Sequence, residues 1–176
     1  MLKVINETAA FIKTRVKDQA TIGIILGSGL NNVANEMLVT TSIPYAEIPN
    51  FPIPTVAGHK GVLLFGKLNG INVIAMQGRF HFYEGYDMKQ ITFPIRIMKA
   101  LGVETLVLSN AAGGMNPTYN LGDIILVEDH INFFPDNPLR GKNEDSLGPR
   151  FPDMSEVYDN QIILKVLTSK IINYLK

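Results

Sequence analysis

The sequence contains no cysteine, so disulfides, thiolate zinc sites and cysteine nucleophiles are all excluded. Neither sign of charge is in excess, because 16 Lys and Arg residues balance 16 Asp and Glu residues. Without an excess of positive charge, the chain is not expected to bind nucleic acid or an anionic membrane. Any anion must be bound by local groups. No apolar run approaches the ~20 residues that span a bilayer, and residues 1–20 do not resemble a signal peptide. These absences predict a cytoplasmic protein.

The composition is typical of a globular protein, with 46% hydrophobic and 18% charged residues in a chain of 176. A chain of this length is expected to form a single domain, residues 1–176. Helical periodicity alternates with short β-branched runs, which predicts an α/β fold. Asn69-Gly70 between two apolar runs predicts a hairpin, so the central β-sheet is expected to be mixed and flanked by helices. Helices are predicted at residues 2–16, 87–101 and 158–176, and strands at residues 21–26, 61–67, 71–77, 105–108 and 123–127.

Two stretches are predicted to lack regular structure. Residues 41–54 carry four prolines, which favour an extended loop, and residues 132–155 combine proline with many charges, which favours a long surface segment. The last predicted helix presents a wide apolar stripe that needs a partner surface. That partner is either another subunit or elements absent from this sequence.

Two of the predicted strands are followed by turns made of small residues. Gly27-Ser28-Gly29 allows successive amides to converge on an anion, and Ser28 adds a hydroxyl donor. Ser109 to Gly114 (SNAAGG) allows close approach of the backbone, and Asn110 offers an amide. The simpler interpretations are a tight turn and a strand-to-helix turn. Ligands gather at the carboxyl ends of strands in open α/β sheets, which favours a binding role for these turns taken together.

A third strand is followed by Arg79, His81 and Tyr83 at alternating positions. If this segment stays extended, the three side chains share one face, where a cation, an imidazole and a phenol would suit an oxyanion with attached hydroxyls. The alternative is that Arg79 pairs with Glu84 and the histidine is satisfied within the loop. The other histidines, His59 and His130, have no spacing that indicates a metal site, so no metal is predicted.

Seven segments, in order, resemble the signatures of trimeric purine nucleoside phosphorylases. They are GIILGSGL at 23–30, EIPNFPIPTVAGHKG at 47–61, QGRFHFYEGY at 77–86, SNAAGGMNP at 109–117, GDIILVEDHIN at 122–132, NPLRG at 137–141 and RFPDMSEVYD at 150–159. The resemblance covers nearly the whole chain and implies a phosphorylase/hydrolase-like fold. It also implies phosphorolysis of purine nucleosides such as inosine and guanosine for purine salvage, with phosphate as co-substrate and no cofactor.

The resemblance also implies roles for individual residues. Ser28, Arg79, His81 and the backbone amide of Ala111 would bind phosphate, with His81 as the catalytic residue. Tyr83, His59 and Phe151 would contact the ribose, Phe151 in the neighbouring subunit's site, which implies a homotrimer. Asn110 would lie beside the base pocket. Each role is implied by the residue that matches the family's motif at that position.

The sequence departs from the family in two places. Asn31 stands where the family often has glycine. The family's chains also continue well beyond Lys176, and their further part carries the residues that hold the purine, so base specificity is not readable here. Two other functions stay open: a methylthioadenosine phosphorylase, which the forms of the second and third turns disfavour, and a non-catalytic ligand-binding or oligomerisation paralogue.

Overall fold

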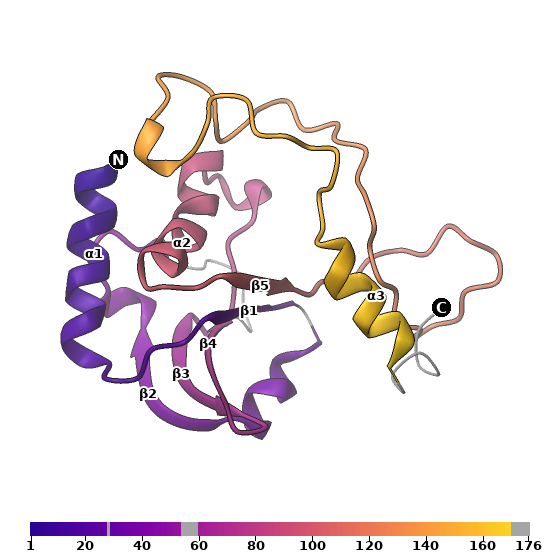
Figure 1. Ribbon diagram of the computed structural model, residues 1–176, viewed down its shortest axis with the longest axis horizontal. Coiled ribbons are helices and arrows are strands. Elements are labelled where there is room, and N and C mark those ends of the chain that lie inside the picture. The colour runs from indigo at the N-terminus through magenta and orange to yellow at the C-terminus, as the bar shows by residue number, and fades with distance from the viewer. Residues whose placement is uncertain (28, 54–59, 170–176) are drawn as a thin grey trace. The chain divides into compact units, whose positions relative to one another are not determined.

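One mixed sheet of five strands, in the order β2-β3-β4-β1-β5, organises the first part of the chain (Figure 1). The computed structural model describes residues 1–27, 29–53 and 60–169. The chain divides into two units, Met1–Ala111 and Ala112–Lys176. The strands are β1 (Ile22–Leu26), β2 (Leu38–Pro44), β3 (Val62–Leu68), β4 (Ile71–Gln77) and β5 (Thr105–Leu108). β1 runs parallel to β4 and β5, whereas β3 is antiparallel to β2 and β4, so the predicted mixed sheet is confirmed.

The hairpin between β3 and β4 forms at the predicted Asn-Gly pair. Asn69 and Gly70 both have positive φ, at 49° and 82°, and the strands pair from Val62↔Gln77 to Leu68↔Ile71. A two-residue turn with both φ values positive matches the right-handed twist of the strands that it joins. The local sequence therefore determines the register of this pair.

Helices α1 (Leu2–Arg15) and α2 (Met88–Ala100) contact each other beside the sheet (Figure 1). A capping box begins α2, because Asp87 Oδ1 accepts a bond from the Gln90 amide at 2.7 Å and the Asp87 amide donates to Gln90 Oε1 at 2.9 Å. The helix ends before Gly102, whose φ of 102° suits the residue just past a helix. Both helices were predicted from their apolar periodicity.

The two faces of β1 are covered by different elements. Gly23 faces α2, because a Cβ placed there would lie 2.9 Å from the Met98 sulfur. Alternate residues of a strand point to opposite faces, so Ile24 and Leu26 point away from α2. They pack in a cluster with Ala34 and Met37, from the short helix η1 (Asn31–Glu36) and the residue after it. Apolar contacts on both faces hold β1 at the centre of the fold.

The prediction of a loop over residues 41–54 is wrong at its beginning, where β2 (Leu38–Pro44) forms. β2 is an edge strand with Ile43 as its one buried residue, so its sequence lacks a clear alternation of apolar and polar residues. Pro44 is its last residue, a position at which the missing N–H costs no bond in the middle of the ladder. The chain leaves the sheet after Pro44 through the short helix η2 (Tyr45–Glu47).

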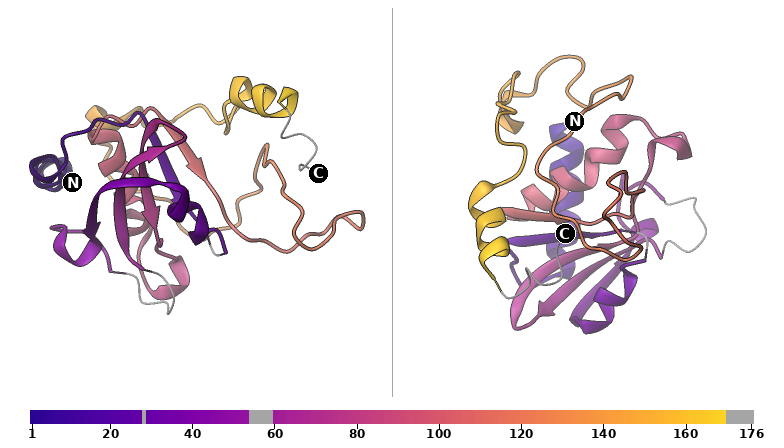
Figure 2. Two further views of the ribbon diagram at one scale, coloured as in Figure 1. Left: turned by 90° about the horizontal axis from the view of Figure 1, so that it is seen from below. Right: turned by 90° about the vertical axis from the view of Figure 1, so that its right-hand side faces the viewer.

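The second unit, from Ala112, runs mostly without regular structure as far as it is described (Figure 2). The predicted buried strand at residues 123–127 is wrong, because Ile124 forms an isolated bridge and its side chain is 57% exposed. A β-branched run becomes a strand only beside a partner, and the described residues of this unit form turns, the short helix η4 (Asp145–Leu147) and one α-helix. The surface segment at residues 132–155 is confirmed.

Helix α3 (Asn160–Thr168) is shorter than predicted. Asp159 begins it by accepting bonds from the amides of Gln161 and Ile162 at 2.8 and 3.0 Å. Ser169, which follows, has extended φ and ψ, so α3 ends at Thr168 and the predicted continuous helix is interrupted there, while its remaining part lies outside the described residues. No helix in residues 1–27, 29–53 and 60–169 is both long and apolar enough to cross a membrane.

Candidate active site

Three parallel strands, β4, β1 and β5, lie side by side and end at the same edge of the sheet (Figure 1). The chain continues into Gly27 after β1, into Gly78 after β4 and into Ser109 after β5. These are the turns that the sequence singles out. Their hydrogen bonds, described below, confirm that the three turns meet.

The turns after β1 and β5 are in direct contact. The Ser109 hydroxyl donates to the Ile25 carbonyl at 3.1 Å and accepts a bond from the Gly27 amide at 3.0 Å. A Cβ at Gly27 would lie 2.2 Å from the Ser109 carbonyl oxygen, well inside van der Waals contact. Glycine is therefore required at position 27 so that the two backbones approach each other.

A buried tyrosine holds the turn after β4 through a hydrogen bond. Gly78 has a φ of 110°, which favours glycine, and its carbonyl accepts a bond from the Tyr45 hydroxyl at 2.7 Å. The Tyr45 ring is 1% exposed and packs at centroid distances of 5.0 and 5.5 Å from Phe51 and Phe80. Burial raises the pKa of the Tyr45 phenol far above its usual value. The hydroxyl therefore stays a donor that positions the residue before Arg79.

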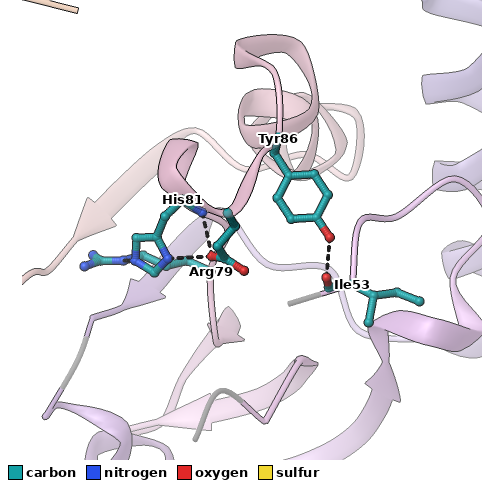
Figure 3. Close-up of polar contacts among 5 residues, drawn as sticks. Ile53, Arg79, His81 and Tyr86 are labelled. Carbon is teal, nitrogen blue, oxygen red and sulfur yellow. Dashed lines mark hydrogen bonds and ion pairs between the residues drawn. The ribbon is translucent and has the colours of Figure 1, made fainter. Parts of the chain in front are cut away.

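Arg79 links the turn after β4 to the turn after β5. Its Nε donates to Nε2 of His81 at 3.0 Å, and one terminal nitrogen donates to the Ser109 carbonyl at 2.9 Å. Figure 3 shows the guanidinium beside the His81 ring. These bonds hold a permanent positive charge at the point where the three strand ends meet.

His81 is oriented by an almost completely buried carboxylate. Glu84 Oε1 lies 2.7 Å from His81 Nδ1 and accepts a bond from the His81 amide at 2.9 Å, while the Glu84 side chain is 1% exposed. A carboxylate only accepts, so Nδ1 carries the proton, and Nε2 is the acceptor for Arg79. This network assigns the neutral tautomer with the proton on Nδ1.

Tyr83 meets His81 by a different geometry from the one expected. Residues Phe82–Glu84 form a short 3-10 helix, η3, so the segment does not stay extended beyond His81. The Tyr83 ring nevertheless stacks on the imidazole, with ring centroids 4.7 Å apart and an interplanar angle of 16°. Arg79, His81 and Tyr83 therefore form one cluster, as expected, although by stacking and not by strand alternation.

The remaining predicted residues have different outcomes. Ser28 and His59 lie outside the described residues. Asn110 and Ala111 directly follow Ser109 and are exposed, and the Asn110 amide donates to the Ala111 carbonyl at 3.3 Å. Phe151 lies in the second unit and is 86% exposed, with the Arg150 guanidinium 5.8 Å from its ring centroid.

Two further hydrogen bonds connect segments near the cluster. Gln77, buried at the end of β4, donates from Nε2 to the Asn31 carbonyl at 3.4 Å and so connects this strand to the segment after Gly27. Asn31 begins η1, so the departure from the family's glycine is accommodated in a helical turn. The Tyr86 hydroxyl donates to the Ile53 carbonyl (Figure 3).

Among the described residues, no group of three or more His, Asp or Glu side chains is arranged to bind a metal.

Sequence reasoning missed the roles of three residues. The sequence suggests Glu84 only as a partner of Arg79, whereas its carboxylate binds His81. Ser109 stands out in the sequence only as a small residue, and Tyr45 belongs to no motif. A signal existed for Glu84, since an acid three residues after a histidine at a turn resembles a capping pair. Ser109 and Tyr45 act on residues 82 and 33 positions away, which local patterns do not reveal.

The relatives found by comparison with known proteins are purine nucleoside phosphorylases. Purine nucleoside phosphorylase 1 of Bacillus subtilis is 54% identical over 158 residues, which are 90% of this chain and 58% of that protein. The purine nucleoside phosphorylase of Bos taurus is 49% identical over 160 residues, 89% of this chain and 55% of that protein. The chain therefore spans somewhat more than half the length of these relatives. The resemblance seen in the sequence motifs is confirmed.

The similar solved structures are also purine nucleoside phosphorylases. A crystal structure of purine nucleoside phosphorylase in complex with ribose-1-phosphate superposes with a TM-score of 0.90 at 42% identity, covering 98% of this chain and 64% of that one. Isoform 2 of the Schistosoma mansoni enzyme, in complex with cytosine and ribose-1-phosphate, gives 0.85 at 46% identity, covering 94% and 60%. The family model of the phosphorylase superfamily matches residues 21–171. Fold, motifs and this match agree, and the chain belongs to the phosphorylase superfamily.

Proposed function

We propose that this chain provides the phosphate and ribose half of a purine nucleoside phosphorylase site. The reaction converts purine ribonucleosides or deoxyribonucleosides, such as inosine and guanosine, and phosphate into the free base and the sugar 1-phosphate, as in purine salvage. The observation that carries this proposal is the Arg79 guanidinium held between His81 and Ser109 where three parallel strands end. The names of the relatives and the ribose-1-phosphate bound in two similar structures support it.

In the proposed reaction, a phosphate oxygen forms a bond to C1′ of the sugar as the C1′–N bond to the base breaks. The base leaves with the electron pair of that bond and takes up a proton. Positive charge builds on the sugar in between, so phosphate is both the nucleophile and a nearby negative charge. The protein must hold phosphate below C1′ in a fixed direction, and positioning of this kind contributes up to about 7–11 kcal/mol in well-oriented systems.

Arg79 is the proposed phosphate anchor. Its planar guanidinium is suited to the oxygens of an oxyanion, and the bonds to His81 and Ser109 fix its plane. Ser28 and the amide of Ala111 are proposed as further phosphate ligands. A charge-assisted bond of this kind contributes about 1.5–3 kcal/mol, so Arg79 alone accounts for roughly ten- to a hundred-fold in phosphate affinity.

His81 is the proposed catalytic residue. With its proton on Nδ1 and bonded to Glu84, it presents the lone pair of Nε2 toward Arg79. One lone pair serves one donor at a time, so a protonated phosphate oxygen or a sugar hydroxyl that binds Nε2 would replace the Arg79 Nε–H, which then donates to phosphate. A neutral imidazole also leaves most of the phosphate charge to act on the developing positive charge of the sugar.

The sugar and base contacts are proposed from the family resemblance together with the cluster geometry. Tyr83 stacks on His81 and is 75% exposed, so its ring and hydroxyl are accessible to a ribose. His59 and Phe151 are proposed ribose contacts, with Phe151 acting in the site of a neighbouring subunit of a homotrimer. Asn110 is proposed to border the base. No cofactor is needed beyond phosphate, and the cytoplasmic location stays a prediction.

The test is phosphate-dependent release of hypoxanthine from inosine by the protein that contains this chain. We expect product formation that requires both phosphate and an intact Arg79, with Arg15→Ala as a control because Arg15 forms an exposed pair with Glu47. Activity on methylthioadenosine in preference to inosine would assign the closely related alternative. Folded protein that binds phosphate and cleaves neither substrate would assign a non-catalytic role and contradict the proposal.

A further inference from the structure

Ser109 is the residue through which the three strand-end turns are connected. Its hydroxyl accepts a bond from the Gly27 amide at 3.0 Å and donates to the Ile25 carbonyl at 3.1 Å, which fixes it to the end of β1. Its amide donates to the same Ile25 carbonyl at 3.1 Å. Its carbonyl accepts the bond from Arg79 at 2.9 Å, which fixes it to the turn after β4. One residue therefore contacts both neighbouring turns through separate polar atoms.

We infer that Ser109 is a positioning residue for the anion site, one that sets the direction of the Arg79 guanidinium and the conformation of the backbone at Gly27. This inference rests on the proposed function, because it assumes that Arg79 and the turn after β1 bind phosphate. Ser109 itself need not touch the anion. Its effect is transmitted through the carbonyl that holds Arg79 and through the hydroxyl that holds the Gly27 amide.

The geometry shows why a hydroxyl is needed at this position. The Ser109 carbonyl is in the turn directly after β5, and the hydroxyl bonds to Gly27 and Ile25 determine where that turn lies relative to β1. Glycine at position 27 permits an approach so close that a Cβ would lie 2.2 Å from the Ser109 carbonyl oxygen. Without the hydroxyl, this turn loses two of its bonds to β1, and the acceptor for Arg79 becomes less well fixed.

A buried hydroxyl elsewhere in the same unit offers a matched control. Thr8 on α1 is fully buried, and its hydroxyl donates to the Pro49 carbonyl at 2.9 Å and accepts a bond from the Asn50 side chain at 3.3 Å. Thr8→Ala and Ser109→Ala thus each remove a hydroxyl that makes two hydrogen bonds. Only the second of these changes affects residues proposed to bind phosphate.

The experiment is calorimetric titration of the protein that contains this chain with inorganic phosphate, together with the thermal midpoint of each variant. For Ser109→Ala we expect the Kd for phosphate to rise about five- to tenfold, the typical effect of losing a hydrogen bond. Ser109→Thr keeps the hydroxyl and should retain an affinity within about twofold of the original. Thr8→Ala should lower the thermal midpoint and leave the Kd unchanged.

The outcomes are distinguishable. An unchanged Kd in Ser109→Ala, or an equal rise in Thr8→Ala, would overturn the positioning role and leave the proposed function standing. If the unsubstituted protein does not bind phosphate, the proposed function fails and this inference with it. Should Ser109→Ala not fold, Ser109→Cys takes its place, since a thiol is similar in size and a weaker donor. Failure of both to fold, while Ser109→Thr folds, would assign Ser109 to folding and overturn the inference.

Discussion

Glu84 binds His81 twice through one oxygen, with Oε1 2.7 Å from the ring Nδ1 and 2.9 Å from the backbone nitrogen. The carboxylate therefore fixes both the position of the residue and the tautomer of its ring. Because a single buried acceptor serves two donors, its loss leaves both without that partner. The same oxygen thus links the fold of η3 to the chemistry proposed for Nε2.

Glu84→Ala should therefore impair the site and the fold together. We expect phosphate affinity to fall about tenfold and the free energy of unfolding to fall by about 1–3 kcal/mol, the cost of leaving buried polar groups unsatisfied. Glu84→Gln should lose less stability, because an amide oxygen in the place of Oε1 is still a hydrogen-bond acceptor. Phosphate titration and urea unfolding on the same samples check this. A Glu84→Ala protein with normal phosphate affinity would show that His81 needs no orienting group.

Arg79→Ala should raise the KM for phosphate roughly ten- to a hundred-fold, the effect of losing a charge-assisted contact, and should lower kcat because the attacking oxygen is no longer directed. Arg79→Lys should recover only part of this, since a point charge does not reproduce the planar fork. Steady-state kinetics with varied phosphate measure both quantities. If Arg79 has a structural role alone, thermal stability will fall while the phosphate KM stays normal.

Gly27→Ala should destabilise the sheet edge, because the new methyl carbon would lie 2.2 Å from the Ser109 carbonyl oxygen. Backbone atoms cannot move aside as a flexible side chain would, so we expect a loss near the upper end of the usual overpacking cost of about 1–3 kcal/mol. Phosphate affinity should fall as well. Gly113→Ala is the matched control, since nothing lies within 4 Å of a Cβ there. Equal unfolding free energies for the two variants would contradict the close approach.

Tyr45 is expected to make the free energy of unfolding depend on pH in the alkaline range. Its pKa is raised by burial in the folded chain and is about 10 in the unfolded chain, so below pH ~10 the phenol is neutral in both states and its contribution is fully present. As pH rises above that value, the unfolded state releases the proton first, and the free energy of unfolding falls. Tyr45→Phe should be less stable at pH 8, having lost the bond to Gly78, yet lose less stability between pH 8 and 10.5. Urea unfolding at both pH values tests this, and parallel losses would refute it.

The predicted homotrimer is testable through Phe151, which is 86% exposed in the chain. If Phe151 of one subunit completes the site of its neighbour, Phe151→Ala and Arg79→Ala proteins should each be weakly active. Mixed after reversible dissociation, they should recover part of the activity, because some sites receive an intact Arg79 and a neighbour's intact Phe151. Sedimentation should show a trimer at micromolar concentration. A monomer, or mixtures no more active than their components, would exclude a shared site.

The sequence predicts the centre of this fold better than its edges. β1 and β4 are apolar runs buried by neighbours on both sides, so their patterns are clear, and Asn69-Gly70 determines the turn before β4. β2 buries one residue and shows little pattern. Residues 123–127 have the composition of a strand, but a strand also needs a partner, and composition contains no information about partners.

The candidate site shows the same division. That the three turns would meet follows from parallel strands ending at one edge, and this was predictable. Two contacts depend on the helical turn η3: the bond between Glu84 and His81, and the stacking of Tyr83 on the imidazole. The local sequence does not specify that this turn forms. The role of Ser109 depends on backbone positions set by the whole sheet.

The bond between Gly27 and Ser109 joins residues 82 positions apart, whereas β3 and β4 are joined by a two-residue turn. The hairpin can form from neighbouring segments, but the site edge requires the chain to close a long loop and to align β5 on β1. We therefore expect the binding geometry to form later than the hairpin. An anion held by Arg79 and the turn after β1 would select chains in which the parallel half of the sheet is complete, so occupancy of the site reports the correct assembly of strands that lie far apart in the sequence.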